Sequence, residues 1–254
     1  MNLADSEERN LGIIIPTLQR RPDMLLGALS SALDSSPSQV VVISPDPPGD
    51  FISAHLSEKC LWIVDDANLP QSINVAVKRL KPEITHFAWI GDDDSMLPKE
   101  VQEIFNECDL GHLLIGYCHH IDANGELLWV QEPRLWRMTT PGLVMFTSPI
   151  SQPASIISRA AFDKVGGISP EYPLAFDQDL FTRLVLNFGP PNLVKRSFAR
   201  FRVHNESLSF KNGKAALRES AQIRRSNAPP HLKGATITVD MLRILANSIR
   251  RPLI

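Results

Sequence analysis

Apolar runs of strand length alternate with helically spaced apolar residues through the first hundred positions. Four short runs rich in Val, Ile and aromatic residues have the length and composition of buried strands. Two intervening stretches repeat apolar residues every three or four positions, as amphipathic helices do. The predicted strands are 11–15, 40–43, 61–64 and 86–90, and the predicted helices are 22–34 and 69–80. This alternation predicts a mainly parallel, Rossmann-like α/β sheet with helices on both faces.

The second half of the chain mixes strands and helices in a less regular order. Asn124-Gly125, between two apolar segments, predicts a hairpin across 121–130. Gly166-Gly167 predicts the end of a short helix, and a longer helix is expected from Asp177 to about Gly189. The other predicted elements are helix 98–108, strands 113–117 and 153–158, helix 159–165, and two helices within 211–254 separated at 227–230.

Composition narrows the class of protein. With 254 residues, 43% hydrophobic and 21% charged, the chain has the values of a globular protein, and one domain is favoured over two. Its three cysteines form no C-x-x-C pair, which disfavours a zinc ribbon or a disulfide scaffold and favours a reducing, cytoplasmic location. Residues 1–10 are polar and acidic, so we expect no signal peptide, and no apolar run approaches the roughly 20 residues of a membrane span.

Charge is unevenly distributed along the chain. Residues 211–254 carry nine Lys or Arg against Glu219 and Asp240, a net charge of +7, although the whole chain has a net charge of −2. The rest of the chain is therefore acidic. A basic tail on an acidic body indicates either contact with something anionic or an ordinary solvated face.

The most distinctive local feature is Asp92-Asp93-Asp94, directly after the predicted strand 86–90. Ligands of open parallel sheets bind beyond the carboxyl ends of the strands. Three adjacent carboxylates repel one another, so a cation is expected nearby, and Mg²⁺ or Mn²⁺ would suit oxygen ligands and substrate phosphates. The alternative is an acidic surface loop that caps the next helix.

Five stretches along the chain form a recognisable series. They are Ile13-Ile-Ile-Pro16-Thr17-Leu-Gln-Arg20, Leu69-Pro-Gln-Ser-Ile-Asn74, Asp92-Asp93-Asp94 with Pro98, Gly166-Gly167 with Asp177-Gln-Asp179-Leu180, and Phe201-Arg202-Val-His204 with Ser207. In this order they resemble glycosyltransferase family 2, the nucleotide-sugar transferases with the GT-A fold, and the resemblance covers about residues 11–210. The resemblance implies a glycosyltransferase domain over 1–210, with a nucleotide-sugar half at 11–98, an acceptor half at 99–210 and a basic helical extension at 211–254.

The resemblance also implies roles for individual residues. Asp94 and Asp92, with His204, would hold the divalent cation on the leaving diphosphate, and Asp93 would face ribose or solvent. Asp177 would be the general base that deprotonates the acceptor hydroxyl in an inverting displacement, although capping a helix is a competing role. The expected donor-binding residues are Pro16, Thr17, Arg20, Asp46, Asn74, Asp92 and Asp93. Asn74 could instead cap its helix, and His204 could be a loop histidine bonded to backbone.

Two departures from the family pattern keep a second function open. Asp46 is displaced from the family's base-reading Asp, and Phe176 stands where the family has a Glu before the catalytic Asp. These features favour a degenerate nucleotide-sugar-binding protein as the alternative to a transferase. Asp179 is four residues before Arg183, and we expect an ion pair between them.

The expected partners are a nucleoside-diphosphate sugar and a glycan or lipid-linked acceptor, with no nucleic acid. Apolar residues at helical spacing predict a helix over 236–251, which could pack on its own domain, form a homodimer or contact the inner face of a membrane.

Overall fold

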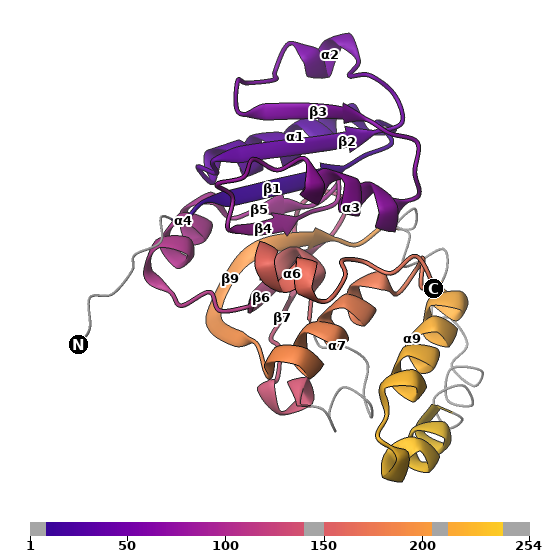
Figure 1. The fold of residues 1–254 in the computed structure, drawn as a ribbon. Coiled ribbons are helices and arrows are strands. Elements are labelled where there is room, and N and C mark those ends of the chain that lie inside the picture. The colour runs from indigo at the N-terminus through magenta and orange to yellow at the C-terminus, as the bar shows by residue number, and fades with distance from the viewer. Residues whose placement is uncertain (1–8, 140–149, 205–212, 241–254) are drawn as a thin grey trace.

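The computed structural model of this chain describes residues 9–139, 150–204 and 213–240. Its nine-stranded sheet has the order β3-β2-β1-β4-β8-β6-β9-β5, with β7 pairing with β6 beside β8 (Figure 1). The strands are β1 (Leu11–Pro16), β2 (Gln39–Ser44), β3 (Cys60–Val64), β4 (His86–Trp89), β5 (Ser95–Met96), β6 (Leu113–Ile121), β7 (Leu127–Gln131), β8 (Ser155–Ser158) and β9 (Asn192–Arg202). The helices are α1 (Pro22–Asp34), α2 (Asp50–Ser53), α3 (Leu69–Lys78), α4 (Pro98–Glu107), α6 (Arg159–Lys164), α7 (Phe176–Phe188) and α9 (Gly213–Asn227), with short 3₁₀ turns at Leu135–Met138, Gln152–Ala154 and Pro230–Leu232.

The predicted α/β fold is confirmed, and the parallel pairing belongs to its first half. The first four strands of the sheet order, β3, β2, β1 and β4, pair in parallel. Parallel pairing requires the chain between consecutive strands to return from one end of the sheet to the other, and these connecting segments do so. From β8 onward the sheet is mixed: β8 is antiparallel to β4 and β6, β7 is antiparallel to β6, and β9 is parallel to β6. The carboxyl ends of β1, β2 and β4 therefore meet at one edge of the sheet, where Thr17, Asp46 and Asp92 begin their loops.

Helices cover both faces of the sheet and divide the core into two layers. On one face, α3 and α7 pack over Ile14, Val41 and Trp89. On the other, α1 and α4 pack over Ile13, Ile15 and Val42. Successive strand residues point to opposite faces, and both faces are buried, so these strands are uniformly apolar instead of alternating.

β9 is the longest of the elements that the apolar pattern did not predict, which also include α2 and β5. It contains Lys195, Arg196 and Arg200 among its eleven residues and pairs with β6 through two register shifts. A strand of this kind has no regular two-residue alternation, so periodicity alone does not reveal it. β9 nevertheless connects the end of α7 to the edge where the acidic triplet lies, and it pairs with β5 just after that triplet.

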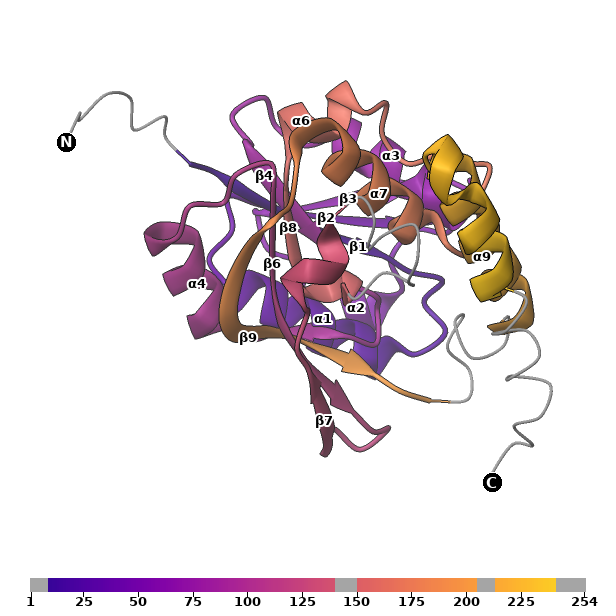
Figure 2. The same cartoon turned by 90° about the horizontal axis from the view of Figure 1, so that it is seen from below.

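The predicted hairpin is present between β6 and β7. Gly125 has a φ of +92°, and the backbone N–H of Gly125 donates to the carbonyl of Asp122. Figure 2 shows the hairpin projecting from the body of the molecule. The side chains of β7 from Leu127 to Val130 are exposed.

The C-terminal extension packs against the domain through α9, which lies alongside α7 in Figure 1. Residues 233–240 form the described part of the following helix. The buried Arg224 of α9 pairs with Asp240 in that helix, and Arg225 contacts the same carboxylate at 3.1 Å. Part of the tail's positive charge is thus neutralised internally. The rest of the predicted 236–251 helix, from 241, lies outside the described residues, so dimer or membrane contact through it stays a prediction.

None of the described helices combines the length and hydrophobicity needed to cross a bilayer.

The Gly166-Gly167 turn is a point of close packing between α6 and α3. Gly167 has a φ of +72°, and a Cβ there would lie 2.8 Å from the Oδ1 atom of Asn74. We expect Gly167→Ala to destabilise the fold by about 2 kcal/mol or more, since both the backbone conformation and the contact oppose a side chain. Urea denaturation measures this change.

Gly27, in the middle of α1, is the matched control because an added Cβ there meets open space. Gly27→Ala is expected to stabilise the protein by about 0.5–1 kcal/mol, as a helix-interior alanine does. Equal effects of the two substitutions would contradict this account of the turn.

Candidate functional site

The loop after β1 ties two strand ends together. Gln19, with a φ of +54°, donates from Nε2 to the Oγ of Ser44 and to two carbonyls of the loop after β2, those of Asp46 and Pro47. Its Oε1 accepts from the backbone N–H of Gly49 at 3.0 Å. The loops after β1 and β2 are therefore held as one surface at the edge where the acidic triplet begins.

The three carboxylates of the triplet point to three different partners. Asp92 accepts a 2.6 Å hydrogen bond from the Oγ1 of Thr17, in the loop after β1. Asp93 lies 3.1 Å from the Nη2 of Arg21 and 2.6 Å from the Nε2 of His204. Asp94 accepts backbone N–H bonds from Arg202 at 2.9 Å and from Gly91 at 3.2 Å.

Burial makes this cluster electrostatically costly. Asp94 is only 5% exposed, and burial, aided by the neighbouring charge of Asp93, raises the pKa of its carboxyl to about 7. Burial also raises the pKa of Asp92, while the hydrogen bond from Thr17 opposes that rise. The neutral forms are favoured because few solvent dipoles reach these groups. A cation placed among the carboxylates would relieve this cost.

Arg21 supplies a cation to the cluster. Its Nη1 lies 2.8 Å from the Nε2 of His204, and its Nη2 lies 3.1 Å from Asp93 and 4.0 Å from Asp92. One guanidinium thus joins the loop after β1, the triplet and the end of β9. The sequence argument chose Arg20 for this loop, but Arg20 is exposed to solvent and it is Arg21 that reaches the site.

The predicted metal ligands are only partly brought together. Asp94 faces the backbone of Gly91 and Arg202, whereas His204 contacts Asp93. Asp92, Asp93 and His204 gather oxygen and nitrogen donors around a cationic group, and these donors suit Mn²⁺ or Mg²⁺. Among the described residues no three His, Cys, Asp or Glu side chains form a complete cluster, so water and phosphate oxygens would have to fill the remaining positions of a bound ion.

Asn74 has a different place from the one expected. Its Nδ2 donates to the carbonyl of Ile168 at 2.8 Å, and its Oδ1 accepts from the N–H of Ile168 at 2.9 Å. The amide therefore joins α3 to the glycine turn, and the cap of α3 is Asn68, which accepts from the N–H of Gln71. The capping alternative for Asn74 is therefore wrong, and its contact with the donor stays a prediction.

Asp177 lies in the first turn of α7 and does not cap the helix. The N-cap is Ala175, and Asp177 accepts at Oδ1 from the neighbouring N–H of Gln178 at 2.8 Å. Burial raises the pKa of the Asp177 carboxyl, as a general base near neutral pH requires. The expected pair of Asp179 with Arg183 is present at 2.7 Å, whereas Asp177 forms no ion pair with any of the residues that the structure describes.

Asp46 and Phe176 are the two positions at which the sequence departs from the family pattern. Asp46 is exposed at the rim, with its backbone carbonyl held by Gln19 and by the indole N–H of Trp62. Phe176 is buried in the core layer of α7, so the place of the expected Glu is occupied by packing. Pro16 ends β1 beside Ile43.

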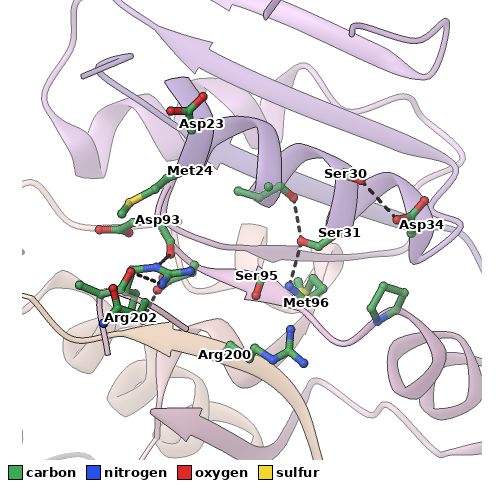
Figure 3. A pocket seen from close by; sticks show the side chains of 16 residues that line it. Asp23, Met24, Ser30, Ser31, Asp34, Asp93, Ser95, Met96, Arg200 and Arg202 are labelled. Carbon is green, nitrogen blue, oxygen red and sulfur yellow. Dashed lines mark hydrogen bonds between the residues drawn. The ribbon is translucent and has the colours of Figure 1, made fainter. Parts of the chain in front are cut away.

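A cavity of about 550 Å³ opens beside the triplet on the α1 side of the sheet (Figure 3). Asp23 and Asp34 of α1 line one wall, and Arg200 and Arg202 of β9 line the opposite wall. Arg202 is already engaged, because its guanidinium donates to the carbonyls of Asp93, Asp122 and Ala123. The cavity is lined by α1, whose core layer lies on the opposite face of the sheet from that of α7.

Comparison with known proteins identifies the fold. No protein-family model matches the chain, and no curated protein sequence does. Solved structures match with high probability: that of S. aureus TarS residues 1–349 at 15% identity and a TM-score of 0.59, covering 91% of this chain and 69% of that one. The same fragment with UDP matches at 16% identity and 0.58, and with UDP-GlcNAc at 15% and 0.60, covering 69% and 70% of those chains. The chain has a GT-A-like glycosyltransferase fold.

The structure brings Thr17 to Asp92 and His204 to Asp93, as members of one predicted site, and it adds Gln19 and Arg21, which the sequence argument missed. The functional roles of these residues and of Asp177 stay predictions. Arg21 was adjacent to the residue chosen, and only the path of the loop into α1 distinguishes the two. Gln19 carried no chemical signal, because its role depends on a positive φ that the sequence does not display.

Arg21 and a divalent cation would compete for one position. We expect Mn²⁺ to raise the melting temperature of Arg21→Gln more than that of the unchanged protein, because the substitution removes the guanidinium that pairs with Asp92 and Asp93. Thermal unfolding with and without Mn²⁺ measures the difference. Arg20→Gln, the exposed neighbour, should behave as the unchanged protein does, and an identical Mn²⁺ response in all three proteins would contradict the competition.

Proposed function

We propose that this protein is a family 2 glycosyltransferase that moves a sugar from a nucleoside-diphosphate donor to the hydroxyl of a glycan or lipid-linked acceptor. The observation that carries the proposal is the convergence of Thr17, Arg21, Asp92, Asp93 and His204 at the carboxyl ends of the strands of a GT-A-like sheet. TarS structures with UDP and UDP-GlcNAc support a nucleotide sugar as the donor class. The five sequence stretches support the family.

The donor would lie across the joined loops after β1 and β2. Thr17 and Asp92 would position ribose, and the Gln19-linked loop that carries Asp46 would face the base. The diphosphate would meet Arg21 and the triplet. Because charge develops on the diphosphate as its bond to the sugar breaks, cationic groups held there stabilise the transition state more than the bound donor.

A Mn²⁺ or Mg²⁺ ion would be held by Asp93 and His204, with Asp92 as a further ligand, since the Nη2 of Arg21 lies near both Asp92 and Asp93. When bound, such an ion supplies Lewis-acid stabilisation to the leaving diphosphate. This assignment differs from the sequence expectation in placing Asp93 ahead of Asp94, because each oxygen of Asp94 already accepts a hydrogen bond from a backbone amide.

Asp177 would act as general base. Its carboxylate takes the proton of the acceptor hydroxyl while that oxygen bonds to the anomeric carbon, and the bond to the diphosphate oxygen breaks with its electron pair. A single in-line displacement of this kind inverts the configuration at the anomeric carbon. Its raised pKa strengthens Asp177 as a base, since it holds the accepted proton more tightly than an ordinary carboxylate would.

The buried position of Phe176 favours a second candidate, a nucleotide-sugar-binding protein without turnover. Both candidates would bind nucleoside diphosphates. Only the transferase would release nucleoside diphosphate in proportion to the glycosylated acceptor formed, so a screen of UDP-, GDP- and dTDP-sugars with Mn²⁺, by thermal shift and then by product release, distinguishes them.

Asp177→Asn tests the chemistry. We expect unchanged donor affinity and a loss of kcat of about 10²–10⁴-fold, the usual contribution of a general base. In the unchanged protein, kcat/KM should fall as the pH is lowered through a value above the ordinary carboxyl pKa, because burial raises the pKa of Asp177 and protonation removes the base. Calorimetry and initial rates across pH give both quantities; near-normal turnover by the variant would contradict the role.

Asp93→Asn and Asp94→Asn test the metal assignment against each other. We expect Asp93→Asn to lose the Mn²⁺ dependence of nucleoside-diphosphate binding, since an amide is a poor ligand, and Asp94→Asn to retain it. Titration calorimetry with and without chelator measures the dependence. The opposite order would restore Asp94 as the ligand.

A further inference from the structure

The start of α7 is held by a side chain from the C-terminal extension. The Oε2 atom of Glu219, in α9, accepts hydrogen bonds from the backbone N–H groups of Leu174 at 2.8 Å and Ala175 at 2.9 Å. Ala175 is the N-cap residue of α7 and offers no side-chain cap of its own. Glu219 therefore provides, from a distant segment, an anionic acceptor for the N–H of the cap residue, the group that a Glu at the third helical position binds in a capping box.

A second set of contacts joins the same two helices one turn further on. The Oγ of Ser220 donates to the Oε1 of Gln178 at 2.6 Å, and Arg224 donates from Nη1 to that Oγ at 2.6 Å. Ser220, Gln178 and Arg224 are all buried. Arg224 is in turn anchored by Asp240. Buried, hydrogen-bonded networks of this kind fix one relative position of two elements, since a shift would leave polar atoms unpaired.

Apolar packing closes the junction. Tyr172 and Ala175, before and at the start of α7, form a small buried cluster with Ile223 of α9. The segment that leads into α7 is thus held by the extension through hydrogen bonds, a buried polar network and apolar contact. Asp177 is two residues beyond the N–H groups that Glu219 binds.

We propose that Glu219 is a positioning residue for Asp177, and that the extension from 213 to 240 is an integral part of the acceptor side of the site. This inference rests on the proposed role of Asp177 as base. By fixing the backbone of Leu174 and Ala175, Glu219 sets the direction of the first turn of α7 and hence the position of the Asp177 carboxylate. Small displacements of a catalytic group are costly because proton transfer needs hydrogen-bond distance.

Three substitutions of Glu219 and one control test the inference. Glu219→Ala removes the acceptor, Glu219→Asp shortens it by one methylene, and Glu219→Gln keeps an acceptor oxygen without the charge. Glu171→Ala is the matched control, because Glu171 also contacts α9, through Gln222 at 3.3 Å, but binds no backbone of the α7 start.

We expect Glu219→Ala to lower kcat about tenfold or more with donor KM unchanged, and to alter the pH at which kcat/KM falls. Glu219→Gln should recover most of kcat, Glu219→Asp should fall between the two, and Glu171→Ala should match the unchanged protein. A purely structural role would reduce the folded fraction, which scales all rates together and leaves both KM and the pH profile where they were.

Amide hydrogen exchange at Leu174 and Ala175 gives a readout that does not depend on turnover. Faster exchange at these two amides in Glu219→Ala, with protection restored in Glu219→Gln, is expected.

If the unchanged protein transfers sugar and Glu219→Ala keeps its kcat and pH profile, the positioning role is wrong. If no donor supports transfer by the unchanged protein, the proposed function fails, and the exchange result still decides whether Glu219 holds the helix start. Should Glu219→Ala not fold, the Asp and Gln variants carry the comparison, and equal kcat in both would overturn the inference.

Discussion

Three adjacent carboxylates at the end of β4 impose the constraint on which the rest of the site depends. They cannot all remain ionised at short range in a partly buried loop unless each finds a different compensating group. The fold meets this requirement by bringing three separate elements to one place: a hydroxyl from the loop after β1, a guanidinium from the start of α1, and a backbone amide at the end of β9. The same electrostatic tension that makes the loop costly gives it affinity for an additional cation and for the ligands that accompany one.

The first half of the fold follows closely from the sequence, and the physical reason is local. Each buried parallel strand is a continuous apolar run, and α1 was predicted with the bounds that the structure shows, because Pro22 and the helical spacing define it within thirteen residues. β9 was not predicted, because the features that make it a strand are not local. Its charged residues and register shifts make sense only beside β6, more than seventy residues earlier in the chain.

The residues of the site also fall into two groups: those that a local sequence segment reveals, and those whose role depends on contacts between distant segments. The triplet, Thr17, His204 and Asp177 occur in recognisable segments, so sequence alone could propose them as site residues. Their partners could not be identified in this way. Asn74 binds Ile168, 94 positions away, and Glu219 binds Leu174 from a segment outside the recognised domain. Neither contact leaves a local pattern in the sequence, because each depends on the packing of helices that are not neighbours along the chain. The expected cytoplasmic location and the boundary at 210 stay predictions.

The bond from the backbone of Arg202 to Asp94 also has a consequence for the order in which the protein can acquire its structure during synthesis. These residues are 108 positions apart. At the usual pace of translation, about 5–20 residues per second, the acidic loop emerges roughly 5–20 s before the strand that holds it. The parallel half of the sheet can assemble during that interval, but the triplet must wait as a solvated, mutually repelling loop. The edge of the nascent sheet where sugar nucleotides would bind therefore becomes ordered late, when β9 arrives.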